Sequence, residues 1–138
     1  MLFETKSEVD IHEMSPLALA FVGDAVLELL VRARLVGTTR LQPNRLHTVA
    51  THYVSAHAQN LELAVIEPML TDAEAAVLRR GKNASKATVA KHATPEEYRC
   101  STGFEALLGW LYLQGQTDRI RQLFDFIWEN FDPTQPEG

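Results

Sequence analysis

Two acidic residues, Asp24 and Glu105, each stand alone inside a strongly apolar segment of the sequence. Asp24 interrupts LALAFVGDAVLELL and Glu105 interrupts CSTGFEALLGWLYL. A buried carboxylate without a partner is costly, so each must be compensated or used. Two such helices are expected to pack against each other in the core, where a divalent cation could bridge the carboxylates. Hard oxygen ligands suit Mg²⁺, which can activate water for attack on a phosphodiester.

The residues alone leave other partners open for this pair. Glu28 lies four residues after Asp24 and shares its helix face, so it either assists at the site or points to solvent. Alternatively, Asp24 and Glu105 each pair with a basic side chain and only stabilise the fold. The first interpretation gives a metal site, and the second gives two structural ion pairs.

Capping signals divide the chain into helices that could position these carboxylates. Ser15 before Pro16 is a candidate N-cap, as is Asn44, and the sequences TDAE from Thr71 and TPEE from Thr94 match capping boxes. The helices expected from these signals cover residues 16–36, 45–66, 71–81 and 94–113, with Gly37 and Gly81 as the stop signals of the first and third. A last helix is expected from the apolar stripe Ile120, Leu123, Phe124, Ile127 and Phe131.

These helices predict an all-α fold, because no segment alternates polar and apolar residues as a strand would. The expected arrangement is an N-terminal segment at 1–14, one domain of about five to seven helices at 15–131, and a polar tail at 132–138. The small, polar and basic segment 82–93, KNASKATVAKHA, is expected to be a loop between helices.

The composition fits one intracellular globular domain. The chain has 138 residues, with 46% hydrophobic and 22% charged residues, which is enough for a core and far from disorder. The N-terminus is acidic, unlike a signal peptide, and the apolar run 17–31 is too short and too charged to cross a membrane. The single Cys100 excludes an internal disulfide and fits a reducing compartment such as the cytoplasm.

Charge is distributed unevenly along the chain. The net charge is −5, which by itself disfavours a polyanionic partner, yet residues 79–91 contain five basic side chains and no acid. Such asymmetry allows a basic face on an acidic protein. A helical interaction domain without a nucleic-acid partner stays open at this point.

Both acidic segments resemble the two signature helices of the ribonuclease III family. FVGDAVLEL, at 21–29, is similar to the family's F-L-G-D-A-V-L, and FEALLGWLYL, at 104–113, is similar to F-E-A-L-I-G-A-L-Y-L. The motifs occur in the family's order, about eighty residues apart. The resemblance implies a ribonuclease III-type endonuclease domain with Asp24 and Glu105 as its catalytic, metal-binding pair.

The chain departs from full ribonuclease III in ways that match the Mini-III ribonucleases. Ala20 and Thr102 stand where the larger enzymes have further acids, and the chain ends where a double-stranded-RNA-binding domain would begin. A silent member that binds structured RNA or pre-ribosomes as a dimer is therefore the alternative, although Thr102 could still supply an oxygen. Further Mini-III landmarks are PLALA at 16–20, PNRLH at 43–47, YVSA at 53–56 and RRGKNA at 79–84.

The resemblance to Mini-III implies a homodimeric, Mg²⁺-dependent endoribonuclease that cuts double-stranded RNA. Its expected substrate is precursor 23S ribosomal RNA, trimmed at the 5′ and 3′ ends during large-subunit maturation, with a large-subunit ribosomal protein as helper and no membrane partner. The expected location is the cytoplasm, or the plastid stroma in a plant. The candidates for contacts with the RNA backbone are Arg79, Arg80, Lys82, Asn83, Lys86 and Lys91.

Overall fold

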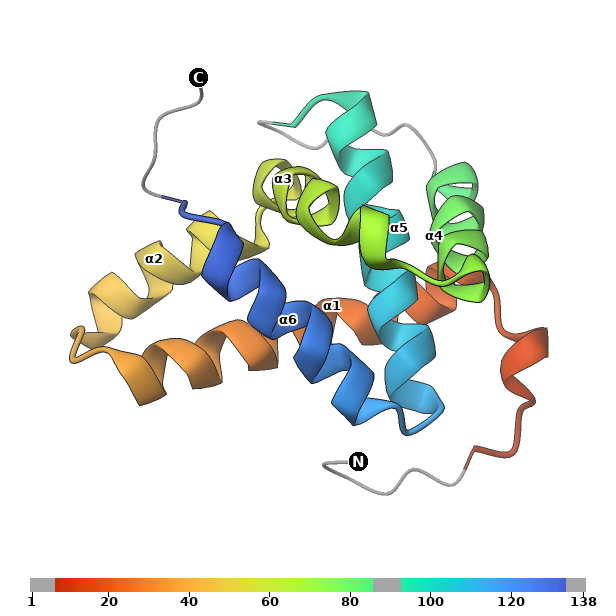
Figure 1. Cartoon of the computed structure of the whole chain (residues 1–138), viewed down its shortest axis with the longest axis horizontal. Coiled ribbons are helices and arrows are strands. Elements are labelled where there is room, and N and C mark those ends of the chain that lie inside the picture. The colour runs from red at the N-terminus through yellow and green to blue at the C-terminus, as the bar shows by residue number, and fades with distance from the viewer. Residues whose placement is uncertain (1–6, 86–92, 134–138) are drawn as a thin grey trace.

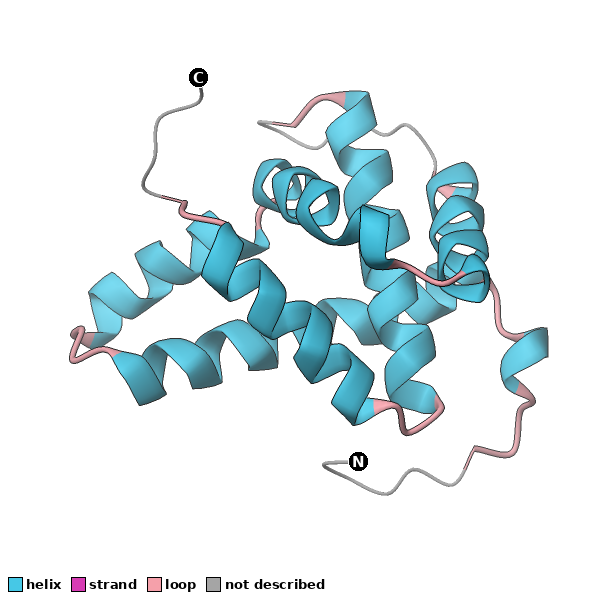
Figure 2. Ribbon diagram, in the orientation of Figure 1, coloured by secondary structure: helices cyan, strands magenta, loops and turns pink. Residues whose placement is uncertain are grey.

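Helices form all of the regular secondary structure in the part of the chain that the structure describes. The computed structural model describes residues 7–85 and 93–133, and no strand occurs within them (Figure 2). This confirms the all-α class. The elements are η1 (Ile11–Glu13), α1 (Pro16–Thr38), α2 (Pro43–Val54), α3 (Ala56–Ile66), η2 (Glu67–Met69), α4 (Asp72–Ala84), α5 (Pro95–Leu113) and α6 (Thr117–Asn130).

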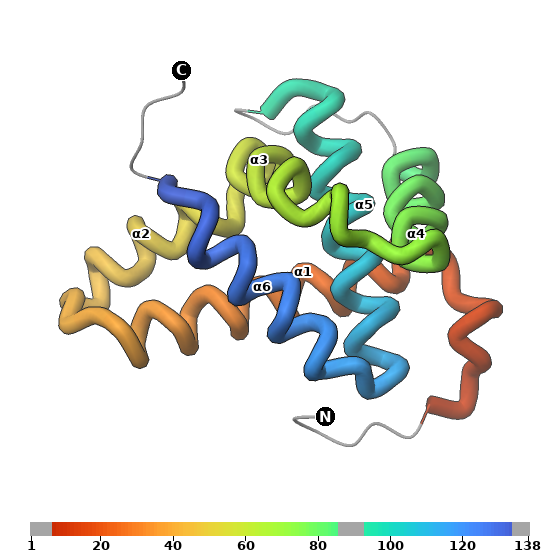
Figure 3. The backbone as a smooth tube through the Cα atoms, viewed as in Figure 1, coloured from red at the N-terminus to blue at the C-terminus, as the bar shows by residue number. Residues whose placement is uncertain are grey.

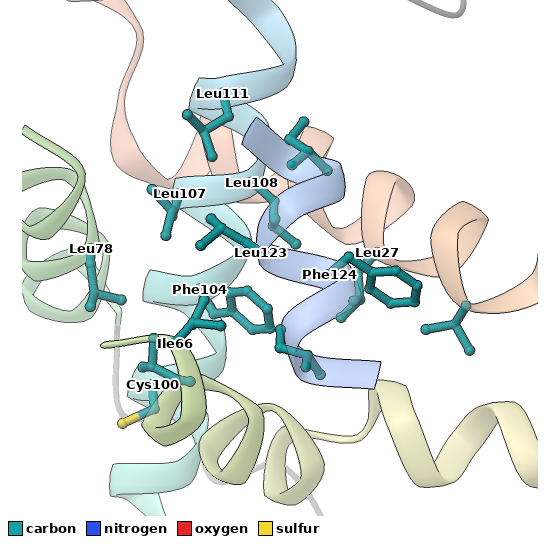
Figure 4. Close-up of a cluster of buried hydrophobic side chains, with 14 of the residues drawn as sticks. Leu27, Ile66, Leu78, Cys100, Phe104, Leu107, Leu108, Leu111, Leu123 and Phe124 are labelled. Atoms are coloured by element: carbon teal, nitrogen blue, oxygen red, sulfur yellow. The ribbon is translucent and has the colours of Figure 1, made fainter. Parts of the chain in front are cut away.

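Helix α5 is the central element of this fold. Helices α1, α3, α4 and α6 all pack against it, and α1 crosses it most extensively (Figures 1 and 3). The faces that meet are apolar, and Phe104, Leu107 and Leu111 of α5 are at most 1% exposed. Leu27 of α1 and Leu123 of α6 close around them (Figure 4). Burial of this apolar surface is the main force holding the helices together.

The second predicted helix is wrong in two respects. Residues 45–66 form two helices, α2 and α3, separated at Ser55, whose backbone is extended at φ −62° and ψ 156°. Its hydroxyl accepts a hydrogen bond from the Ala58 N–H at 3.1 Å, so Ser55 caps α3 and ends the preceding helix. Gln42, rather than the predicted Asn44, occupies the N-cap position of α2, because Pro43 begins the helix.

Both glycines expected to end helices lie inside them. Helix α1 continues through Gly37 to Thr38, and α4 continues past Gly81 to Ala84. Gly81 is buried against α5, where an added Cβ would lie 2.8 Å from the Gly103 Cα. It therefore allows close helix packing and does not end α4. As a result, Lys82 and Asn83 belong to the last turn of α4, which corrects their predicted place in a loop.

The remaining capping and periodicity predictions are confirmed. Ser15 caps α1, and the capping boxes at Thr71 and Thr94 are complete. The predicted stripe on α6 is buried at Ile120, Leu123, Phe124 and Ile127, while Phe131 follows the helix as its C-cap. Among the described residues, no helix has both the length and the apolar character needed to cross a membrane.

Candidate active site

The site is built where α1 and α5 touch through their backbones. A Cβ added to Gly23 would lie 1.6 Å from the carbonyl oxygen of Glu105, and one added to Gly109 would lie 1.9 Å from that of Leu19. Only glycine permits this approach at either position. Asp24 follows one of these glycines directly, and Glu105 supplies the carbonyl that packs against it, so the contact sets the spacing between the two acids.

The carboxyl groups of Asp24 and Glu105 are hydrogen-bonded to each other. Burial, followed by the hydrogen bond with Asp24 and its negative charge, raises the pKa of Glu105 to about 9. Glu105 is partly buried, but Asp24 is exposed, so the expectation that both lie in the core is wrong for Asp24. The pair lies at the edge of the helix crossing, where one carboxyl group is open to solvent.

Within the described residues, neither carboxyl group forms an ion pair with lysine or arginine. Glu28 lies near Glu105, and its negative charge further raises the pKa of that residue. Arg32 donates to Glu28 at 3.1 Å rather than to Asp24 or Glu105. The described residues therefore do not support the interpretation of two separate structural ion pairs. No lysine or arginine among them neutralises the negative charge of the Asp24 and Glu105 pair.

This arrangement suits a hard divalent cation. Two adjoining carboxyl groups present only oxygen ligands, and they repel each other unless a proton or a cation lies between them. The described residues contain no group of three or more histidine, cysteine, aspartate or glutamate side chains placed to hold a metal. The donor set therefore fits Mg²⁺, which keeps several waters and takes one or two protein carboxylates, better than a site made wholly of protein ligands.

The two positions at which acids are missing are buried. Ala20 and Thr102 are 8% and 7% exposed. The Thr102 hydroxyl donates to the Tyr98 carbonyl oxygen at 3.1 Å and lies 3.3 Å from the Ser85 hydroxyl. Thr102 is thus engaged in contacts within α5 and with the end of α4, one turn away from Glu105.

Two buried polar residues of α3 were not predicted, and one of them contacts the site. Gln59 and Glu62 of α3 are 3% and 0% exposed, and the Gln59 side chain is hydrogen-bonded to Glu105. They lie three residues apart on the face that also buries Leu63 and Ile66. Polar residues at the apolar positions of a helical repeat are the signal that could have revealed them.

The predicted RNA-contacting residues divide into three groups. Arg79, Arg80 and Asn83 are exposed on the last turns of α4. Lys82 is partly buried, and its ammonium lies 3.7 Å from a Glu96 carboxylate oxygen. These turns adjoin α5 at Gly103, two residues before Glu105. Lys86 and Lys91 lie outside the described residues.

Comparison with known proteins agrees with both motifs. The family model named Ribonuclease III domain matches residues 17–116. A Mini-ribonuclease 3 of Enterococcus faecalis is 43% identical over 119 residues, covering 85% of this chain and 90% of that protein. One of Symbiobacterium thermophilum is 46% identical over 118 residues, covering 83% and 91%. A crystal structure of a Fusobacterium nucleatum protein superposes with a TM-score of 0.78 at 28% identity, covering 87% of this chain and 96% of that one.

Proposed function

Because the chain belongs to the ribonuclease III family, on its Mini-III branch, we propose that this endoribonuclease depends on Mg²⁺ and cuts double-stranded RNA. The observation that carries the proposal is the hydrogen-bonded pair of Asp24 and Glu105, held on two helices in backbone contact. A metal ligand must be ionised, so Glu105 has to release the proton that its raised pKa retains at neutral pH. Binding of a cation would thereby replace the proton shared by Asp24 and Glu105.

Each acid has a distinct task in this scheme. Asp24 is exposed, so its carboxylate would be open to bound RNA, whereas Glu105 is partly buried and hydrogen-bonded to neighbouring side chains. Bound Mg²⁺ would lower the pKa of a coordinated water and neutralise charge on the scissile phosphate. No side chain needs to act as a nucleophile.

Basic residues at the end of α4 are proposed to bind the RNA backbone. Double-stranded RNA is recognised largely through its phosphates and 2′-hydroxyls, which suits exposed cations beside the site. Affinity should fall steeply with added salt, because each phosphate contact releases counterions. The set comprises Arg79, Arg80, Lys82 and Asn83, with Lys86 and Lys91 from the segment outside the described residues.

The homodimer is proposed from the exposed face of α1. Leu17, Phe21 and Leu29 are 45%, 84% and 50% exposed, although they lie on the helix that carries Asp24. A groove of about 820 Å³ between α1 and α6 continues this surface; its lining includes Leu29 and Phe124, with Arg34, Arg121 and Asp125 as its charged residues. A monomer rarely exposes such a patch, and a two-fold dimer would bring two sites to opposite strands of one duplex.

For its biological substrate, we propose precursor 23S ribosomal RNA, cut near its paired 5′ and 3′ ends. A large-subunit ribosomal protein bound to that RNA would act as helper. The cytoplasm, or the plastid stroma in a plant, is where this substrate and the reduced Cys100 would both be found.

The test is cleavage of a duplex RNA that spans the paired ends of the precursor. Wild type should cut it in Mg²⁺ and not in Ca²⁺, whereas Asp24→Asn and Glu105→Gln should be inactive in either ion. Asp118→Asn is the matched control, because this acid lies on α6 with its side chain 97% exposed. Phe21→Asp should yield a monomer by light scattering, with Leu61→Asp on α3 as its control.

Two outcomes would replace this proposal. If wild type binds the RNA but leaves it intact, with Mg²⁺ and ribosomal proteins present, the protein is a silent RNA-binding dimer, as Ala20 and Thr102 in place of acids would suggest. If it shows no salt-sensitive RNA binding, it is an interaction domain with another partner.

A further inference from the structure

Helix α3 buries two polar side chains whose oxygens have no hydrogen-bond donor. Both carboxyl oxygens of Glu62 and the Oε1 atom of Gln59 are buried without a partner. An unsatisfied buried polar atom is costly, so three of them within one helical turn would strongly destabilise the fold.

The nitrogen of the Gln59 carboxamide, in contrast, is fully engaged. Nε2 donates to the Val54 carbonyl oxygen at 2.9 Å, across the break between α2 and α3. The same side chain is hydrogen-bonded to Glu105, where it favours the ionised carboxylate and lowers its pKa. Gln59 thus connects the Ser55 break to the catalytic glutamate.

Glu62 can supply the missing donor. It is completely buried, and burial raises its pKa to about 9, so its carboxyl group keeps a proton at neutral pH. Tyr53 of α2 is a titratable neighbour, and a negative charge on Glu62 would raise the pKa of its phenol. Residues three apart share a helix face, which places the Glu62 O–H and Gln59 Oε1 within one turn.

We propose that Gln59 is a positioning residue for Glu105 and that Glu62 holds it in place, by donating its carboxyl hydrogen to Gln59 Oε1. The carboxamide is then fixed at both ends, with Oε1 accepting from Glu62 and Nε2 donating to Val54 and Glu105. In this arrangement Gln59 Oε1 and the protonated oxygen of Glu62 acquire a partner, so two of the three buried oxygens are satisfied. The rotamer of Glu105 is set before any metal binds. This role rests on the proposed function of Glu105 as a metal ligand.

The hydrogen bonds that lead from Glu62 through Gln59 to Glu105, here called the relay, have a chemical consequence for the site. A fixed N–H donor from Gln59 orients the Glu105 carboxylate and stabilises the charged form that would bind a cation. Outer residues that orient a ligand in this way typically affect metal affinity or activity by about 10- to 100-fold. Gln59 and Glu62 should thus affect metal binding without touching RNA.

Three variants separate the relay from simple packing. Gln59→Leu removes the contact with Glu105, Glu62→Leu removes only the donor, and Glu62→Gln keeps a donor in its amide. Ile66→Val is the matched control, since Ile66 is 0% exposed on the same face of α3 and has no polar role. Replacing a buried carboxyl by leucine of similar size should leave the protein folded.

Two readouts without RNA test the relay. The first is Mn²⁺ affinity by calorimetry, which should fall about tenfold or more in Gln59→Leu and Glu62→Leu. It should stay within about twofold of wild type in Glu62→Gln and Ile66→Val, even where Ile66→Val lowers thermal stability. The second is the Gln59 side-chain amide signal in ¹⁵N NMR spectra, which should be slow to exchange in wild type and Glu62→Gln and fast in Glu62→Leu.

The outcomes distinguish the relay from the proposed function. Wild-type Mn²⁺ affinity and a slowly exchanging Gln59 amide in Glu62→Leu would overturn the relay, as would equal defects in Glu62→Gln and Glu62→Leu. If wild type binds no Mn²⁺ yet Glu62→Leu still releases the Gln59 amide, the hydrogen bond exists and the proposed function fails instead.

Discussion

Replacing Gly23 by alanine should move apart α1 and α5, the helices that carry Asp24 and Glu105. The new Cβ would lie 1.6 Å from the Glu105 carbonyl oxygen and 2.9 Å from the Gly109 nitrogen, whereas ordinary contact begins at 3.4 Å. Both neighbours are backbone atoms, so no side chain can rotate away. Helices α1 and α5 must therefore move apart by roughly the difference, about 1.8 Å.

The expected effect on activity exceeds the effect on stability. Overpacking costs about 1–3 kcal/mol, and alanine returns up to about 1 kcal/mol through its higher helix propensity. The protein should therefore fold with a melting temperature lowered by several degrees. Misplacing reacting groups by about 1 Å can cost about 100-fold in rate, and this substitution separates Asp24 from Glu105 by more than that.

Gly37→Ala is the matched control, because it changes a glycine in the same helix where an added Cβ meets nothing within 4 Å. Duplex cleavage in Mg²⁺ and thermal unfolding should be measured for both variants. Gly37→Ala should keep wild-type activity and gain up to about 1 kcal/mol of stability. If Gly23→Ala matched Gly37→Ala in both measurements, the backbone contact would not be what holds the site.

Two further predictions concern buried acids. Between about pH 4.5 and 9, folded Glu62 keeps a proton that the unfolded chain loses, so its contribution lowers the free energy of unfolding by about 1.4 kcal/mol per pH unit as pH rises. Glu62→Gln should reduce the measured slope in urea unfolding by about this amount, while Glu105, whose pKa is raised likewise, keeps its own contribution. An unchanged slope would contradict the raised pKa of Glu62. Arg119 donates to both Glu74 carboxylate oxygens at 2.8 Å, and this holds the pKa of Glu74 below its usual range. Arg119→Met should lower the free energy of unfolding by about 3–5 kcal/mol at pH 7, because it leaves the carboxylate of Glu74, which is 3% exposed, without its partner. The contribution of the pair should fade as acid protonates Glu74. A loss below about 1 kcal/mol at pH 7 would refute this prediction.

Local signals were sufficient for most of the fold. Ser15, Thr71 and Thr94 marked helix starts correctly, because a capping hydroxyl acts on backbone groups only two or three residues away. Ser55 was missed although it caps α3 in the same way, because apolar residues continue across the break. Gly37 and Gly81 failed as helix ends because glycine also serves close packing, and only the partner helix reveals which role applies.

The site itself was predictable only in part. Asp24 and Glu105 stood out as lone acids in apolar segments, and their spacing matched a family pattern. The exposure of Asp24 depends on how α1 leaves the helix crossing, which a sequence pattern does not encode. Gln59 reaches Glu105 through tertiary packing of α3 on α5, so this contact needed the assembled structure.

The packing of α1, α3, α4 and α6 around α5 also affects how the protein unfolds. Amide hydrogens between Phe104 and Leu111 should exchange with solvent only when the whole domain unfolds, while helix ends exchange through local opening. Glu105 is thus anchored in the last segment to open. Catalytic competence should consequently disappear together with the cooperative unfolding transition, rather than decline gradually as peripheral helices loosen.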